Sequence, residues 1–256
     1  MTQPALRTEG LTLRHRNAAQ PVLADFDLTV PAGDIVAILG PSGVGKSSLL
    51  RALAGLEPPA AGRIQVEGAE VTEAHPRVAM AFQDPSLLPW LTLEKNVAFG
   101  LDFRRQPRLD RRQRQDRIDA AIRQVGLSHA RHRYPAHLSG GMAQRTALAR
   151  CLARDPKVLL LDEPFGALDE VTRADMQSLL LDVVAGSATA AVLITHDIEE
   201  ALLLADRILL LGGAPARVVG DWTLDLPKPR QDVGGSALDA VRVEILRTLR
   251  AALPRH

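Results

Sequence analysis

The feature that most constrains this chain is a glycine-rich turn between an apolar run and a helix-like segment. The run Ile35–Leu39 (IVAIL) is apolar throughout, which is typical of a strand buried on both faces of a sheet. The next segment, Gly40–Ser47 (GPSGVGKS), fits the spacing GxxxxGK[ST], and Lys46–Ala54 is predicted to be a helix that ends at Gly55. This order predicts an α/β fold with an anion-binding loop at the carboxyl end of a strand.

The loop is suited to hold the phosphates of a nucleotide. Several backbone N–H groups must point at the phosphate oxygens, and small residues let the chain wrap that tightly. The following helix turns its positive end to the same point. Lys46 adds a full positive charge, and the Ser47 hydroxyl can bind Mg²⁺. A glycine-rich turn without a ligand is the alternative. We expect ATP to contact Gly40, Pro41, Ser42, Gly43, Val44, Gly45, Lys46, Ser47 and Ser48.

Two acids follow a second apolar run. Val158–Leu161 reads as a buried strand, and Asp162 and Glu163 come directly after it. A buried carboxylate is costly unless it is paired or binds a metal. In proteins with such a phosphate loop, the aspartate at this place holds Mg²⁺, and the adjacent Glu163 is placed to accept a proton from an attacking water. The alternative is a strand end capped by solvated acids, which the upstream loop makes a minor possibility.

Strand-like and helix-like segments alternate around a central helical block. Strands are predicted at Leu6–Arg14, Val22–Val30, Arg63–Val66, Val78–Phe82, Ala191–Thr195 and Ile208–Leu211. The pattern is helical from Leu93 to Ala153, and later helices are predicted at Val171–Ala185, Ile198–Ala205 and Ser236–Arg250. We expect a nucleotide-binding domain over residues 1–220 that contains a helical subdomain at about 88–154. A linker and a C-terminal amphipathic helix are expected over 221–256.

The composition of the chain limits the kinds of partner that it is expected to bind. The net charge of +1 and the aromatic fraction of 3% argue against nucleic acid as a partner. The arginines of Leu109–Gln124 alternate with aspartates, which favours a solvated helix face over a nucleic-acid patch. No apolar run approaches the roughly 18–20 residues of a membrane-spanning helix, and Met1–Gly10 lacks a leader pattern. With Cys151 as the single cysteine, no internal disulfide is expected.

A third motif carries a specific resemblance. The segment Leu138–Arg145 (LSGGMAQR) resembles the signature sequence of the ABC ATPases, and it lies one helix upstream of the acid pair as in that family. The resemblance implies a P-loop (RecA-like) core with an antiparallel β subdomain and an inserted α-helical subdomain. It also implies that Ser139, Gly140, Gly141 and Gln144 contact ATP held by a second copy of the chain. The alternative for this motif alone is an ordinary serine-capped helix.

Further residues match elements of the same family in order. Gln83 (AFQDPSLLPW) is similar to the Q-loop glutamine, which implies a metal set of Ser47, Gln83 and Asp162 for Mg²⁺. Asp169 (GALD) resembles the D-loop aspartate of the dimer interface, and His196 (LITHD) resembles the switch histidine near the γ-phosphate. With Glu163, Gln83 and His196 form the expected catalytic set. The family usually stacks adenine on Tyr or Phe, whereas this chain has His15 or Arg16 at that place, and we expect His15 to contact adenine.

The amino-acid sequence around these motifs resembles that of ATP-hydrolysing subunits of nitrate/sulfonate/taurine importers. That resemblance implies a homodimer that closes on two ATP molecules, integral-membrane permease subunits and, indirectly, a periplasmic solute-binding protein. It places the chain at the cytoplasmic face of the inner membrane, held peripherally by the permease. Trp90 and Leu91 are the expected apolar contacts, and a place in the core is the alternative for each of them. The alternatives are a non-transport ABC ATPase of DNA repair or translation, and a P-loop kinase.

Overall fold

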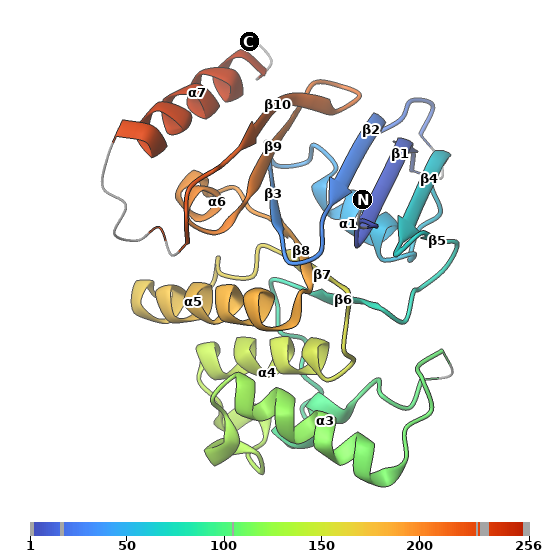
Figure 1. The fold of residues 1–256 in the computed structure, drawn as a ribbon, viewed down its shortest axis with the longest axis vertical. Helices are drawn as coiled ribbons and strands as arrows, with labels where there is room; N and C mark the ends of the chain where they lie inside the picture. Colours follow the sequence, from blue (N-terminus) through green and yellow to red (C-terminus); the bar gives the residue numbers. More distant parts are fainter. Residues whose placement is uncertain (1–2, 16–17, 104, 229, 231–235, 253–256) are drawn as a thin grey trace.

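The structure, a computed structural model, describes residues 3–15, 18–103, 105–228, 230 and 236–252. Within these residues the strands form two sheets, one antiparallel with the order β2-β1-β4-β5 and one largely parallel with the order β10-β9-β3-β8-β7-β6. Figure 1 shows the antiparallel sheet beside the parallel one, and helices α3 and α4 at the opposite end of the molecule from α7. The α/β class predicted from the sequence is confirmed.

The antiparallel sheet is built from strands whose side chains alternate between core and solvent. β1 (Leu6–Leu13) pairs with both β2 (Leu23–Val30) and β4 (Ala61–Val66), and β5 (Ala69–Glu70) extends the edge. Along β2 the buried positions recur every second residue, as a strand with one face on a core requires. This sheet therefore presents one apolar face to the rest of the molecule.

The parallel sheet is apolar along its central strands because both of its faces are covered. Each residue of β3 (Ile35–Leu39) and of β8 (Ala190–Ile194) is buried. β6 (Val78–Ala81) and β7 (Val158–Asp162) continue the sheet on one side, while β9 (Arg207–Gly212) lies on the other side of β3 and pairs antiparallel with β10. A sheet of this kind is the expected environment for runs such as IVAIL.

Successive residues of β3 belong to different cores. Ile35, Ala37 and Leu39 pack in a cluster with helices α5 (Glu170–Ser187) and α6 (Ile198–Leu204). Val36 and Ile38 face the opposite cluster, which contains α1 (Lys46–Leu53) and the inner face of the antiparallel sheet. The two-residue period of a strand thus fixes α1, and the loop before it, between the two sheets.

The central block is helical, with α2 (Leu93–Ala98), α3 (Arg111–Gln124) and α4 (Gly140–Leu152) joined by the short 3-10 turns Ser128–Ala130 and Pro135–His137. A capping box starts α3, since Gln113 N donates to Asp110 and the Gln113 side chain accepts from Asp110 N. Two arginines of α3 pair with acids, Arg114 with Asp102 and Arg117 with Asp155. These pairs fit the solvated face expected here.

One expected boundary is corrected. Strand β10 (Arg217–Thr223) runs through residue 220, so the chain leaves the sheet after Thr223 and not at residue 221. Pairing with β9 holds this stretch, and Arg207 reinforces it by two hydrogen bonds of 2.6 and 2.8 Å to the Asp221 carboxylate. The final helix, α7 (Ser236–Ala252), buries Ile245 in the same core as α5 and α6.

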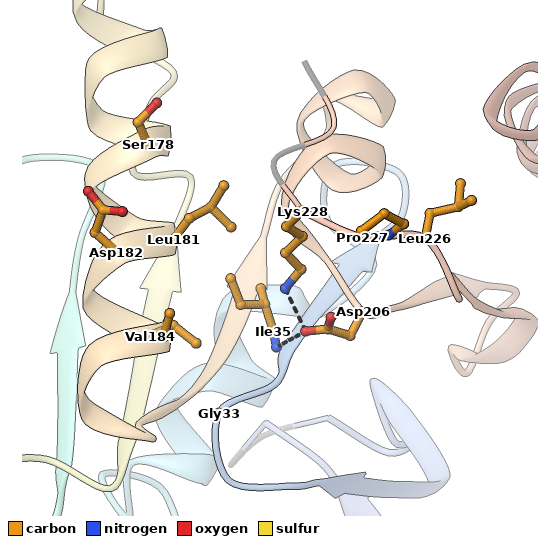
Figure 2. Close-up of a pocket in the computed structure, with 11 residues that line it drawn as sticks. Gly33, Ile35, Ser178, Leu181, Asp182, Val184, Asp206, Leu226, Pro227 and Lys228 are labelled. Atoms are coloured by element: carbon orange, nitrogen blue, oxygen red, sulfur yellow. Dashed lines mark hydrogen bonds and ion pairs between the residues drawn. The ribbon is translucent and has the colours of Figure 1, made fainter. Parts of the chain in front are cut away.

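The segment between β10 and α7 is anchored by two basic residues. Lys228 donates a 2.7 Å hydrogen bond to Asp206, whose carboxylate also accepts from Ile35 N at the start of β3, as Figure 2 shows. Arg230 is only 2% exposed, and its guanidinium donates to the backbone oxygens of Leu202, Ala205, Leu224 and Leu226. The cation therefore caps the end of α6 and holds the backbone of Leu224 and Leu226 against it.

We expect Arg230→Met to lower the free energy of unfolding by about 2–4 kcal/mol, because it leaves buried carbonyl oxygens without donors. Urea denaturation followed by circular dichroism measures the change. Lys157→Met removes a cation from a loop without this set of bonds and serves as the control. A loss of less than about 0.5 kcal/mol for Arg230→Met, the size of an ordinary surface substitution, would contradict the anchoring role.

No helix among the described residues is both long enough and apolar enough to cross a membrane.

Candidate functional site

The candidate site lies at the carboxyl ends of neighbouring parallel strands. In the sheet order β3-β8-β7-β6, the phosphate loop follows β3, His196 follows β8, Glu163 follows β7 and Gln83 follows β6. Parallel strands end at the same edge, so the pairing of these strands gathers four segments that are distant in the sequence. The structure thus brings together the phosphate loop and all three residues of the expected catalytic set.

The phosphate loop has the backbone that its glycines permit. Gly45, which immediately precedes α1, has φ of 104°, and a Cβ at this position would lie 3.1 Å from a methyl group of Val22. A side chain there would meet both backbone strain and this contact. Ser42 and Gly43 are exposed at the tip of the loop. The loop therefore has an open side in front of the α1 N-terminus, where an anion is favoured.

Lys46 is held inside this loop. Its ammonium donates to Gly40 O at 2.7 Å and to Pro41 O at 3.0 Å, and the residue is 7% exposed. Burial lowers the pKa of Lys46, while the charges of Glu163 and Asp162 act to raise it. An ammonium has three donors, and the two loop carbonyls use two of them. One donor therefore remains for a further acceptor.

The first acid of the pair adjoins the loop. Burial raises the pKa of Asp162, and a hydrogen bond from the Ser47 side chain acts in the opposite direction. An acid and a hydroxyl at the mouth of a phosphate loop are hard oxygen donors of the kind that Mg²⁺ takes together with waters. Gln83, the third predicted metal ligand, is exposed on the loop after β6 and adds an amide oxygen. The donor chemistry of these residues fits magnesium with a nucleotide.

Glu163 and His196 meet directly. His196 Nδ1 lies 3.2 Å from Glu163 Oε2, and the Glu163 side chain is 26% exposed. The backbone of Glu163 has a positive φ of 45°, a left-handed conformation that is uncommon for a residue with a side chain. Its N–H donates to Ile194 O at 2.9 Å, which ties this turn to the end of β8. The arrangement places a carboxylate, steadied by an imidazole, beside the phosphate loop.

The Gln144 side chain is bonded to two loops of its own chain. The Gln144 side chain is 6% exposed, and its amide donates to Gln83 O at 2.9 Å and to Pro164 O at 3.0 Å. Both amide hydrogens are therefore used inside one copy of the chain. The Gln144 side chain therefore lies in the core of its own chain, and its predicted contact with ATP held by a second copy stays a prediction.

The other residues of the signature motif lie at the start of α4. Ser139 caps this helix by accepting a hydrogen bond from Met142 N, and Ser139 and Gly140 are exposed. A Cβ on Gly141 would come within 2.4 Å of a Thr172 methyl group, so close packing on α5 also requires this glycine. Among the described residues, no hydrogen bond or ion pair joins Ser139–Gly141 to Gly40–Ser48. The predicted role of the motif toward a second copy stays a prediction.

Asp169 is a helix cap in this structure. Its carboxylate accepts hydrogen bonds from Thr172 N at 3.0 Å and from Thr172 Oγ1 at 2.8 Å, and these bonds lower the pKa of Asp169. The side chain is exposed at the start of α5. Its predicted place in a dimer interface remains a prediction.

The predicted adenine contact borders a hollow. His15 is exposed and lines a cavity of about 380 Å³ together with Val22, Ser48 and Leu56. Ser48 belongs to α1, so the hollow adjoins the phosphate loop on the side of the antiparallel sheet. The alternative residue, Arg16, lies outside the described residues. Nothing in the sequence predicts that Val22 lines this hollow, because its place there depends on the packing of β2 against the phosphate loop.

The sequence analysis missed a buried acid and a half-buried arginine near the site. Glu200 is 4% exposed, and burial raises the pKa of its carboxyl while a hydrogen bond from Thr195 lowers it. Arg173 acts on the same carboxyl electrostatically and donates a 3.1 Å hydrogen bond to Leu168 O, in the loop before α5. The sequence feature that could have identified Glu200 is an acidic residue at an otherwise apolar position of α6. These groups steady the loops that carry Asp169 and His196.

Comparison with known proteins places the chain in a family. Residues 23–166 match the ABC transporter family. The chain is 43% identical to the aliphatic sulfonates import ATP-binding protein SsuB 1 of Xanthomonas axonopodis pv. citri, over 96% of this chain and 98% of the relative. It is 39% identical to the nitrate transport protein NasD of Klebsiella oxytoca, over 99% of both.

Comparison with solved structures supports the same family assignment. A dimeric ATP-binding cassette in a post-hydrolysis state, bound to ADP and Pi, superposes with a TM-score of 0.74 and 27% identity, over 87% of this chain and 100% of the cassette. The cbiO1 protein of Clostridium perfringens, part of an ABC transporter complex, gives a TM-score of 0.79 at 25% identity, over 98% of both chains. The resemblance predicted from the sequence is confirmed, and the chain belongs to the ABC transporter family as one of its nucleotide-binding ATPases.

Proposed function

We propose that this chain is the ATP-hydrolysing subunit of a membrane importer for a small anionic solute of the sulfonate or nitrate type. The observation that carries the catalytic part is the position of Glu163, whose carboxylate lies 3.2 Å from His196 Nδ1 at the strand edge beside Lys46. In this proposal Glu163 accepts a proton from water as the water attacks the terminal phosphate. His196 orients that carboxylate, and Lys46 holds phosphate oxygens.

Magnesium belongs to the same proposal. Ser47, Asp162 and Gln83 would hold the ion, directly or through waters. When bound, Mg²⁺ supplies positive charge that neutralises the phosphates during transfer. The contributions of this chain are the loop N–H groups and Lys46, which bind and orient the nucleotide, and Glu163, which takes the proton.

Two copies are proposed to complete each site. Ser139 and Gly140 are exposed at the N-terminus of α4, a helix of 13 residues, and the phosphate loop has its open side at the N-terminus of α1. A head-to-tail pair would place both helix ends at one terminal phosphate, where each favours negative charge. The solved cassette that resembles this chain is dimeric, which supports a pair of copies. ATP would then favour the closed pair, since it binds that state best.

The proposed permease contact lies on the helical block. Trp90 is 70% exposed, and Phe99 and Phe103 stand over a hollow of about 630 Å³ that is also lined by Leu91 and Ile118. Exposed aromatic residues around a hollow are typical of protein contact surfaces. Through this surface the permease would hold the chain at the inner face of the membrane. A periplasmic solute-binding protein would act on the permease from the other side.

The choice of solute rests on the relatives. Those that match over nearly all of this chain are named for aliphatic sulfonate and nitrate transport. A bicarbonate transport protein is 44% identical over 82% of this chain and 32% of its own length. All three solutes are small anions. The relatives give no support to the alternative role in DNA repair or translation.

Uptake in the host cell tests this proposal. We expect deletion of the gene to abolish uptake of labelled alkanesulfonate or labelled nitrate. A plasmid copy of the wild type should restore it and a Glu163→Gln copy should not, because transport needs hydrolysis. Labelled bicarbonate and a labelled amino acid serve as comparison solutes. Normal uptake of both sulfonate and nitrate in the deletion strain contradicts the solute class, and loss of bicarbonate uptake alone reassigns it.

A further inference from the structure

Gln144 joins three parts of the site that are far apart in the sequence. It lies in the second turn of α4 and donates one amide hydrogen to Gln83 O and the other to Pro164 O, at 2.9 and 3.0 Å. The acceptors are 61 and 20 residues away. One belongs to the loop of the predicted metal ligand Gln83, and the other directly follows Glu163. A single side chain therefore sets the separation between these two loops.

The nature of the acceptors matters. Both are backbone oxygens, so the two bonds fix the path of the main chain and leave the Gln83 and Glu163 side chains free to act. The residue is 6% exposed, so water cannot readily replace these bonds. The Glu163 backbone has a left-handed φ of 45°. A conformation of this kind persists only where the surroundings hold it, and the bond to Pro164 O is one such restraint.

The helix that carries Gln144 also carries the signature residues. Ser139 is the N-cap of α4 and Gln144 follows within its first turns, inside one hydrogen-bonded segment. A rotation or shift of α4 that accompanies contact at Ser139 and Gly140 is therefore passed to both loops through one rigid element. No flexible linker lies between the predicted contact with the second copy and the loops that hold Gln83 and Glu163.

A comparison within the same helix separates this role from ordinary core packing. Thr146, two residues on, is fully buried, and its hydroxyl donates a 2.7 Å hydrogen bond to Met142 O in its own helix. That bond stabilises α4 alone. Gln144 instead leaves its helix with both donors.

We propose that Gln144 is a positioning residue for ATP hydrolysis, which holds the Gln83 loop and the turn after Glu163 in register with α4. This inference rests on the proposed roles of Gln83 and Glu163. It assigns to Gln144 no contact with the nucleotide. The residue is expected to affect turnover and the response to Mg²⁺, while the affinity for ATP stays as in the wild type.

The test is Gln144→Met, which keeps a long unbranched side chain and removes both donors. We expect kcat to fall by about 10- to 100-fold, as for other displaced supporting groups. The Mg²⁺ concentration for half-maximal rate should rise several-fold, and the dissociation constant for ATP should change by less than about 2-fold. Thr146→Val loses one buried hydrogen bond of the same helix and should keep kcat within about 2-fold.

A double variant tests the route through Gln83. If Gln144 acts by placing that loop, Gln83→Ala combined with Gln144→Met should lose less than the product of the two single losses. Gln144→Asn keeps the amide with a shorter reach. It should fall between wild type and Gln144→Met, which provides a folded variant if the methionine is not tolerated. Thermal melting of each variant reports whether the fold is intact.

The outcomes separate this inference from the function on which it rests. A folded Gln144→Met with kcat equal to that of Thr146→Val overturns the positioning role. So does a loss that multiplies fully with Gln83→Ala and leaves the Mg²⁺ response unchanged. If the variants Gln83→Ala and Glu163→Gln hydrolyse ATP at the wild-type rate, the proposed catalytic roles of Gln83 and Glu163 are wrong. That conclusion holds for any result with Gln144→Met.

Discussion

Lys46→Ala is expected to raise the dissociation constant for ATP by roughly 30- to 4,000-fold. The wild-type ammonium is 7% exposed and is held by two loop carbonyls, so its charge acts on phosphate oxygens in a place with little water. Removal of one partner of a buried charged contact costs about 2–5 kcal/mol, and each 1.4 kcal/mol is about tenfold in affinity. Isothermal titration calorimetry with ATP at fixed Mg²⁺ measures this change.

Two further variants show whether charge or loop shape is responsible. Lys46→Met keeps most of the side-chain volume without the charge, and it should lose affinity nearly as strongly as Lys46→Ala. Lys95→Ala removes an exposed lysine of α2 and should leave the affinity as in the wild type. Unchanged ATP affinity in both Lys46 variants would refute the assignment of Gly40–Ser47 as the phosphate site.

Glu163→Gln is expected to lower the rate of ATP hydrolysis by about 10²- to 10⁴-fold, the usual contribution of a general base. The amide keeps the shape of the side chain and can still contact His196, so ATP binding should persist. Because hydrolysis is what ends the closed state in this proposal, the variant should accumulate as a dimer when ATP is added. Steady-state phosphate release gives the rate, and light scattering after gel filtration gives the mass.

The control for this variant is another glutamate of the same edge. Glu199 is exposed on the first turn of α6, where Arg242 of α7 binds it at 2.5 and 2.6 Å. Glu199→Gln should hydrolyse ATP within about 2-fold of the wild type, since ion pairs of this exposed kind contribute little. Turnover of Glu163→Gln at the wild-type rate would remove Glu163 from the mechanism and leave its contact with His196 as a structural one.

Much of the candidate site could be predicted because its motifs are local. The phosphate loop depends on residues next to one another, so its spacing alone predicts a turn whose N–H groups converge. The acid pair is predicted in the same way, from its place directly after an apolar strand. The capped start of α4 is equally local, since Ser139 needs only the N–H of Met142 three residues on. Such features need no knowledge of strand order.

The position of the Gln144 side chain could not be predicted from such local features. Its motif is shared with Ser139 and Gly140, and the sequence predicted one common role for all of them. On a helix, however, residues five apart, such as Ser139 and Gln144, point about 140° apart around the axis. Ser139 and Gly140 are exposed at the helix start, while Gln144 is buried against loops 61 and 20 residues away. Which face of α4 meets those loops is settled by packing against β6 and α5.

By itself the sequence determined the α/β class, the phosphate loop and the acids at the end of β7, since each depends on hydrophobic period and on neighbours in the chain. Only the tertiary structure decided that β8 pairs between β3 and β7, which places His196 against Glu163 at 3.2 Å, and that β10 continues past residue 220. The physical reason is that strand order follows from how two cores are filled on the two faces of one sheet. That choice depends on the whole chain at once.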